Sequence, residues 1–158
     1  MLGEPSERDA FAARVAAALY PRDVTAQRLG MTIEAVGMGW CRLTMPVAPE
    51  MLNGHGVAHG GYIFTLADTA FAYACNGDNR VTLAQHAQIT FVSPGQAGEL
   101  LIAEARELSK SGRSGLYDVE VRGAGARLVA AFRGASRTVG GQTDPALGEA
   151  PEAGKAAS

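Results

Sequence analysis

The sequence predicts an α+β protein in which an antiparallel sheet of about five or six strands curves around one long helix. Three observations lead to this prediction. Residues 60–76 are apolar almost all round and contain no proline, which is typical of a buried helix. Residues 81–138 are rich in strand formers broken by short turns, which favours antiparallel pairing. A helix that buries all its faces needs a sheet that curves around it.

Length and composition limit the possible classes of protein. The 158 residues, of which 47% are hydrophobic and 19% charged, suit one folded domain with its own core. The 14 basic and 16 acidic residues leave a net charge of −2. A dense basic face for nucleic acid or for an anionic membrane is therefore not expected. The first residues lack the charged-then-apolar order of a signal peptide, so we expect a cytoplasmic protein with no membrane partner.

The first 22 residues form a predicted N-terminal helical segment. Ser6 is a typical N-cap, and Phe11, Val15 and Leu19 then recur every four residues as a thin apolar stripe. We expect this helix to end near Pro21. A short helical turn over 23–28 would follow.

The main domain is predicted to span residues 23–139. Residues 31–47 are strand formers with a bend at Gly37-Met38-Gly39, and residues 48–59 are a loop rich in glycine and proline. After the 60–76 helix, strands are expected over four further runs: 81–92, 99–109, 115–122 and 127–138. Residues 140–158 hold a single large aliphatic side chain, Leu147, and are predicted to be a disordered tail.

Two glycines, Gly60 and Gly61, open the buried helix. The first backbone N–H groups of a helix have no partner inside it, and the helix dipole adds partial positive charge there. With no side chain to block approach, this end can polarise a carbonyl and stabilise an oxyanion. The alternative is that the glycines only allow close packing or an unusual backbone angle.

Asp68 is the only charged residue between Gly60 and Gly77. A carboxylate on a buried helix costs several kcal/mol unless a function or a partner requires it, so Asp68 is a candidate site residue. Asp68 lies eight residues after Gly60, which is about 12 Å along a helix. One helix cannot place both on one carbonyl. If they act together, Asp68 must come from a second chain, with two antiparallel helices across a twofold axis.

The histidines and cysteines do not indicate a metal site. His55 and His59 are four residues apart, but the glycines around them place them in a loop. Cys41 and Cys75 are not in a CxxC pair. We expect His59 to orient the loop instead. Asn53 has two open interpretations, either bonding the loop backbone or positioning a water or a substrate carbonyl.

These residues resemble the hotdog-fold acyl-CoA thioesterases, and the phenylacetate-degradation subgroup in particular. The resemblance rests on the run Asn53-x-x-Gly56-x-x-His59-Gly60-Gly61 and on the helix Leu66-Ala-Asp68-Thr-Ala-Phe71 that follows it. Later strands such as Phe91-Val-Ser-Pro94-Gly look like family strands too. The resemblance covers roughly residues 25–138.

The resemblance implies an acyl-CoA thioesterase that hydrolyses (hydroxy)phenylacetyl-CoA-type substrates. Gly60 would donate its N–H to the thioester carbonyl, and Asp68 of the facing subunit would be the nucleophile or the general base. Asn53 would help hold the attacking water or the thioester, and His59 would orient that region. The family implies homodimers with composite sites, usually paired as homotetramers. It implies no metal and no cofactor, since coenzyme A is part of the substrate.

Further candidate contacts to the acyl-CoA substrate complete the site hypothesis. Some relatives carry a hydroxyl near the position of Ala84, and here Thr82 or Gln85 would have to replace it. The substrate-binding candidates are Gly61, Phe64, Thr69 and Arg113.

Two other functions stay open at this point. A hotdog hydratase or dehydratase would use a loop histidine with an acid, for which His59 and Asp68 are candidates. A non-catalytic acyl-CoA-binding protein would keep the glycine helix end but would have no need of Asp68.

Overall fold

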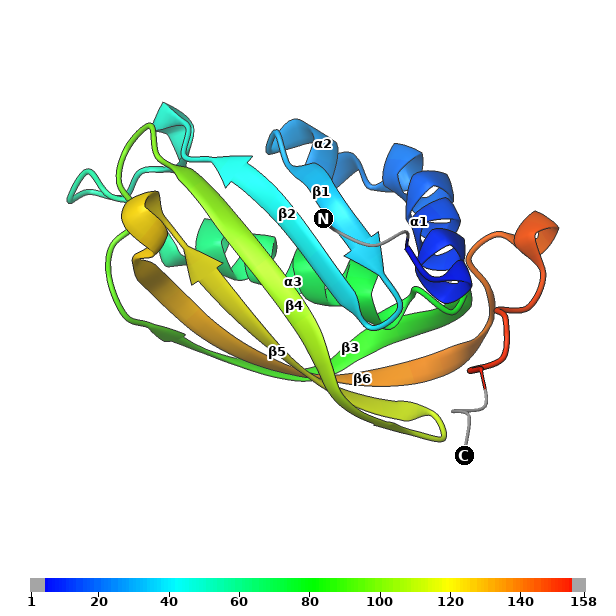
Figure 1. Cartoon of the computed structure of the whole chain (residues 1–158). Coiled ribbons are helices and arrows are strands. Elements are labelled where there is room, and N and C mark those ends of the chain that lie inside the picture. The colour runs from blue at the N-terminus through cyan, green and yellow to red at the C-terminus, as the bar shows by residue number, and fades with distance from the viewer. Residues whose placement is uncertain (1–4, 155–158) are drawn as a thin grey trace.

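The computed structural model describes residues 5–154 and confirms the α+β class. A six-stranded sheet of order β1-β2-β4-β5-β6-β3, antiparallel throughout, curves around the helix α3 (Gly60–Cys75), as Figure 1 shows. This is the hotdog arrangement expected from the resemblance. The strands are β1 Thr32–Gly37, β2 Trp40–Pro46, β3 Arg80–Phe91, β4 Leu100–Ser111, β5 Ser114–Arg122 and β6 Leu128–Gln142.

The N-terminal helices follow the predicted pattern. The helix α1 (Glu7–Leu19) begins at Ser6, whose side chain accepts a hydrogen bond from the backbone N–H of Asp9 at 3.1 Å. Phe11 and Val15 are buried, as the apolar stripe predicted. A short 3-10 turn (Tyr20–Arg22) leads into α2 (Val24–Arg28). Residues 1–4 of the predicted N-terminal segment lie outside the described residues.

The helix α3 fills the concave side of the sheet because its side chains suit that space. Leu66, Ala67 and Ala70 are fully buried. Phe71 packs against Tyr117 of β5 and Phe132 of β6, with ring centroids 5.3 and 5.8 Å apart. Small residues let the helix approach the sheet closely, and aromatic residues fill the wider part of the core.

One edge of the molecule is left open in a single chain. Within residues 5–154, β3 pairs only with β6, so its other edge has no neighbouring strand. Along the side of α3 that the sheet leaves uncovered, four side chains are only partly buried: Thr65, Asp68, Thr69 and Ala72. An unpaired long strand beside an uncovered helix face is a surface on which a second chain can pair.

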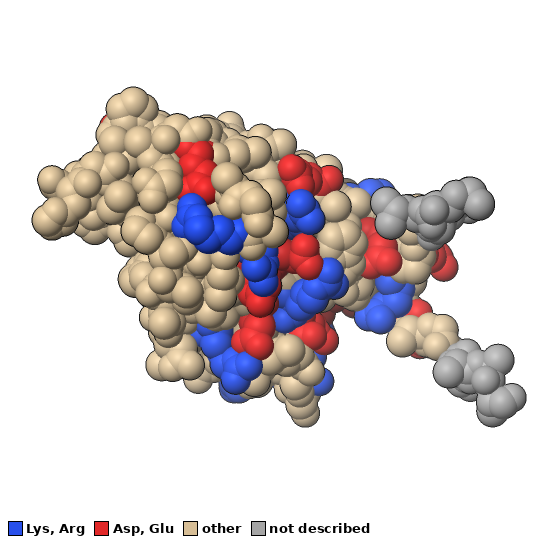
Figure 2. All heavy atoms as spheres, turned by 60° about the vertical axis from the view of Figure 1, so that its left-hand side comes forward, with Lys and Arg blue, Asp and Glu red and all other residues tan. Residues whose placement is uncertain are grey.

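The outer face of the sheet is charged, in contrast to its inner face. Figure 2 shows blue and red side chains that alternate across it. Arg42 lies 2.8 Å from Glu34 and 3.6 Å from Glu104, and Arg133 lies 2.6 Å from Asp118. Exposed pairs of this kind each contribute about 0–1 kcal/mol. They mark this face as polar, which is why the core lies on the α3 side only.

The structure differs from the expected disordered tail for residues 140–148. Strand β6 continues to Gln142, and the chain then folds back on Asn79. The Asn79 amide donates to the carbonyls of Asp144 and Gly148, both at 2.9 Å, and its oxygen accepts from the Asp144 N–H. Polar contacts rather than apolar side chains hold this segment, so hydrophobic patterning could not reveal it. Residues 155–158 lie outside the described residues.

No helix in the described part of the chain is long and apolar enough to cross a membrane.

Candidate active site

The loop before α3 is built around Asn53. The Asn53 Oδ1 accepts hydrogen bonds from the N–H groups of His55 at 2.9 Å and Val57 at 3.4 Å. Its backbone N–H donates to the Val57 carbonyl at 2.8 Å, and Gly56 turns the chain with a φ of 75°. The Asn53 oxygen therefore serves the loop, which was one of its two open interpretations. Its Nδ2 has no hydrogen-bond partner among residues 5–154.

His59 caps the N-terminus of α3. Its Nδ1 accepts from the Gly61 N–H at 3.0 Å, which places the ring proton on Nε2. The His59 carbonyl accepts from the Tyr62 N–H at 3.0 Å, and the His59 N–H donates to the Met51 carbonyl at 2.7 Å. These bonds satisfy the helix N–H groups that follow Gly60. The Gly60 N–H itself has no partner in the described part of the chain.

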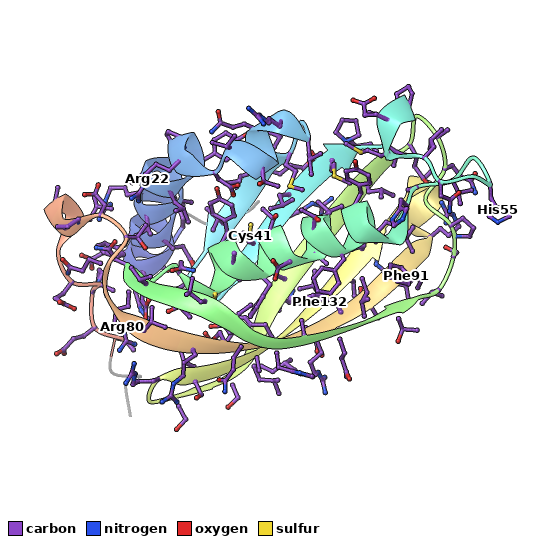
Figure 3. The ribbon with its side chains drawn as sticks, turned by 180° about the vertical axis from the view of Figure 1, so that it is seen from behind. Arg22, Cys41, His55, Arg80, Phe91 and Phe132 are labelled. Carbon is purple, nitrogen blue, oxygen red and sulfur yellow. The ribbon has the colours of Figure 1, made fainter. Side chains whose placement is uncertain are left out.

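A side chain at position 60 would meet the ring of Phe91. A Cβ on Gly60 would lie 2.9 Å from Cζ of Phe91, closer than such atoms approach in real structures. Figure 3 shows Phe91 near the N-terminal end of α3, close to the loop that carries His55. A side chain at position 60 would therefore have to displace the half-exposed Phe91 ring. Both interpretations of Gly60, close packing and an accessible N–H, stay open.

Asp68 lies two turns further along α3 without a partner. Its side chain is partly buried and makes no hydrogen bond or ion pair within residues 5–154. Burial raises the pKa of its carboxyl above the usual aspartate value, since no nearby group offsets the loss of water. An aspartate that keeps no structural partner and has a raised pKa is suited to taking up a proton or attacking a carbonyl.

Gly60 and Asp68 lie on one continuous helix, so their separation is about 12 Å along its axis. That is too far for both groups of one chain to contact the same thioester carbonyl. The observed helix therefore has the separation that the sequence spacing predicts. A site that uses both residues needs two copies of α3.

Three of the predicted substrate contacts lie on α3. The Gly61 N–H is already engaged with His59. The Thr69 hydroxyl donates to the Thr65 carbonyl at 2.7 Å, which leaves its oxygen able to accept. Phe64 is partly buried and packs edge-to-face on Phe132 with centroids 5.4 Å apart.

Arg113 lies at the other end of the sheet. Its Nε donates to the Thr138 carbonyl at 2.9 Å, and Thr138 pairs with Thr82 near the start of β3. Phe91, which touches Gly60, is nine residues further along the same strand, about 30 Å away. Within one chain the structure does not bring Arg113 to the N-terminus of α3.

The strand after α3, β3, has few hydroxyl groups free to assist at the site. Thr82 is buried, and its Oγ1 lies 3.0 Å from that of Thr138. Gln85 is exposed at a β-bulge, and Ala84 pairs with the buried Ser136 of β6.

Sequence reasoning did not single out Phe91 as a site residue, because an aromatic at the end of a strand has no signature that separates it from a core residue.

The chain matches a known family and a curated relative over the region that carries the site. The Thioesterase superfamily matches residues 55–130, which include the capped helix end and Asp68. The chain is 43% identical over 124 residues to the acyl-coenzyme A thioesterase PaaI of Escherichia coli (strain K12), covering 78% of this chain and 89% of that protein.

Solved structures agree with the sequence match. The E. coli PaaI protein from the phenylacetic acid degradation operon superposes with a TM-score of 0.84 at 41% identity, covering 85% of this chain and 98% of that one. A mutant of the phenylacetic acid degradation protein PaaI from Thermus thermophilus gives a TM-score of 0.71 at 32% identity, covering 74% of this chain and 100% of that one.

Proposed function

The chain belongs to the thioesterase superfamily and is a thioester hydrolase of the PaaI acyl-CoA type, and on this premise we propose that it hydrolyses (hydroxy)phenylacetyl-CoA-type aryl thioesters to the free acid and CoA. The observation that carries the proposal is the Gly60 N–H, which has no partner in the described chain at the capped end of α3. The choice of an aryl acyl group is supported by the similar E. coli protein, which comes from a phenylacetic acid degradation operon.

Gly60 polarises the thioester carbonyl. Negative charge grows on the carbonyl oxygen as the tetrahedral transition state forms, and a fixed N–H at a helix N-terminus stabilises that charge. His59 supports this role because its Nδ1 engages the neighbouring Gly61 N–H at 3.0 Å and fixes the first turn. His59 is thus a positioning residue. One donor of this kind contributes about 10²–10³ in rate.

Asp68 of the facing subunit supplies the second half of each site. Two α3 helices that run antiparallel across a twofold axis would bring each Gly60 close to the partner's Asp68. The unpaired edge of β3 and the uncovered side of α3 support this dimer. The dimer then carries two equivalent composite sites. We further propose that these dimers pair as homotetramers in the cytoplasm.

The reaction consumes one water and needs no further cofactor. As general base, Asp68 takes a proton from water while the water oxygen bonds to the carbonyl carbon; the C–S bond then breaks and CoA leaves with a proton on sulfur. As nucleophile, Asp68 forms an anhydride with the acyl group as CoA leaves, and water then cleaves that anhydride. Single-turnover hydrolysis in ¹⁸O-labelled water tests the second route, because label enters Asp68 only when water attacks the Asp68 carbonyl of an anhydride.

The remaining candidates take supporting roles. The Nδ2 of Asn53, which has no partner in the described chain, would hold the attacking water or the thioester. Gly61, Phe64 and Thr69 would line the acyl group along α3. Arg113 lies far from Gly60 of its own chain, so it would contact the phosphate-bearing part of CoA instead.

A hydratase that uses His59 as its base has less support. The Nδ1 of His59 is occupied in capping α3, which leaves only the protonated Nε2 facing outward. A non-catalytic binding protein would not need an aspartate that has no structural partner.

The direct experiment measures release of CoA from phenylacetyl-CoA, with hexanoyl-CoA as an alkyl comparison. We expect turnover by the wild type and its near-complete loss in Asp68→Asn. Asp118→Asn, which changes an exposed carboxylate paired with Arg133, is the matched control and should retain activity. No release of CoA from either thioester by the folded wild type would overturn the proposal.

A further inference from the structure

Phe91 is placed against the proposed carbonyl-binding group. It is the last residue of β3, and it follows Ala87 and Ile89 on the side of the strand that faces the core. The tip of its ring points at Gly60, since a Cβ there would lie 2.9 Å from Cζ and 3.3 Å from both neighbouring ring carbons. This places an aromatic ring against Gly60, whose N–H has no partner in the described chain, and Figure 3 shows Phe91 near this end of α3.

The Phe91 ring is not part of the core. Its side chain is 51% exposed, while Ile89, two residues earlier, packs against the core cluster. A phenyl ring left half open at the mouth of a site gains from any flat apolar group that covers it. An acyl group whose carbonyl binds the Gly60 N–H would therefore contact the apolar ring of Phe91.

The helix continues this apolar surface in the direction of Asp68. Gly60, Phe64 and Asp68 are each four residues apart, so they lie on one side of α3. Phe64 is partly buried against Phe132 and lies one turn from Gly60. Gly60 therefore has the ring of Phe91 against it, and Phe64 lies one turn further along the same side of α3.

We infer that Phe91 determines acyl-group specificity, its ring forming the wall on which the acyl group packs while its carbonyl binds the Gly60 N–H. This inference rests on the proposed function and deepens it. Ring-on-ring contact favours a flat aryl group over an aliphatic chain of similar size, because aromatic pairs interact beyond their buried area. Replacing the ring with an aliphatic side chain removes that advantage and leaves the catalytic groups in place.

The experiment compares kcat/KM for phenylacetyl-CoA and hexanoyl-CoA in the wild type, Phe91→Leu and Phe91→Tyr. In Phe91→Leu we expect the ratio of aryl to alkyl activity to fall by roughly 3–10-fold, because hydrolysis of phenylacetyl-CoA should lose more from removal of the ring than hydrolysis of hexanoyl-CoA. Phe91→Tyr keeps the ring and should keep the ratio. Leu108→Ala, at an equally exposed residue of β4, is the control and should also keep it.

The outcomes separate this inference from the proposed function. An unchanged ratio in Phe91→Leu, in an enzyme that prefers the aryl substrate, overturns the inference and leaves the function standing. An unchanged ratio together with loss of the dimer in sedimentation assigns Phe91 to subunit contact and also overturns it. A wild type that prefers hexanoyl-CoA, or releases no CoA, overturns the proposed substrate itself.

Discussion

The surroundings of two aspartates near α3 shift their pKa values in opposite directions. Asp78, just after the helix, lies 2.7 Å from Nζ of Lys110 and 2.9 Å from the Arg80 guanidinium. Burial alone would raise the pKa of Asp78, but the hydrogen bond and charge of Lys110, helped by Arg80, lower it. Asp68 has no such partner in the described chain, so burial raises its pKa.

The difference distinguishes a carboxylate that stabilises the fold from one that we propose to be reactive. At Asp78 the lost water is replaced by two cations, so its ionised form stabilises the fold. At Asp68 nothing replaces the lost water, so its ionised form weakens the fold. A residue kept at a cost to stability is a candidate for function, whereas a residue that is fully satisfied requires no further explanation.

The largest expected effect separates the two aspartates directly. Asp68→Asn should lower kcat by about 10³-fold or more, because it removes the proposed base or nucleophile. The same change should raise the melting temperature at neutral pH, since it removes a charge that burial disfavours. Enzyme assays and thermal melts on one preparation check both. A lower melting temperature would mean that Asp68 has a structural partner after all.

The next effect concerns Gly60. Gly60→Ala should reduce hydrolysis of hexanoyl-CoA by about 10²-fold, because the new methyl displaces the Phe91 ring and disturbs the carbonyl-binding N–H. Removing the ring in Gly60→Ala/Phe91→Ala relieves this clash, so part of the loss should be recovered. A double variant whose loss equals the product of the single losses would contradict the contact.

The pH dependence follows from the direction of the Asp68 pKa. Both chemical routes need the ionised carboxylate, so kcat/KM should fall as pH falls through its raised pKa, above the usual aspartate value of 3.8. Initial rates at pH values where circular dichroism shows a folded chain measure this fall in kcat/KM. A fall centred at or below pH 3.8 would show that Asp68 is not desolvated.

Replacing Asp78 should have a smaller effect, and it should lower stability where Asp68→Asn raises it. Asp78→Asn should lower the free energy of unfolding by about 1–3 kcal/mol, since it leaves Lys110 partly buried without its partner. Because the pKa of Asp78 is lowered, the stability it provides is present above the unfolded value and is lost as pH falls through the folded one. The difference in urea unfolding between variant and wild type should therefore be present at neutral pH and vanish at acid pH.

The smallest expected effect tests the cap on α3. His59→Ala removes the acceptor for the Gly61 N–H and should cost about 1 kcal/mol in unfolding free energy, with a reduced kcat. His55→Ala, in the same exposed loop, is the matched control because its side chain makes no hydrogen bond within the described residues. Equal stability losses in the two variants would argue against the cap.

Much of the fold could be predicted because it depends on periodic patterns. The apolar run 60–76 became α3, and Gly37-Met38-Gly39 became the turn between β1 and β2, with a φ of 78° at Gly39. The course of residues 140–148 could not be predicted, since it depends on polar contacts with residues distant in sequence, chiefly Asn79 and also Arg22.

The site was predictable only in part. The helix end at Gly60 and the isolated charge at Asp68 are visible in the sequence as breaks in a pattern. The contact between Gly60 and Phe91 joins residues 31 positions apart, so it requires the folded sheet. The use of the Asn53 oxygen inside its own loop is likewise set by backbone geometry rather than by residue type.

The most direct test of the account asks whether the two halves of a site come from different chains. Gly60→Val and Asp68→Asn are each expected to be inactive alone. After unfolding and refolding as an equal mixture, half the dimers carry both variants, and each of these holds one site with an intact Gly60 and an intact Asp68. With composite sites, we expect recovery to about a quarter of wild-type activity. A mixture that stays inactive, although mixed dimers are shown by mass spectrometry, would contradict the composite site.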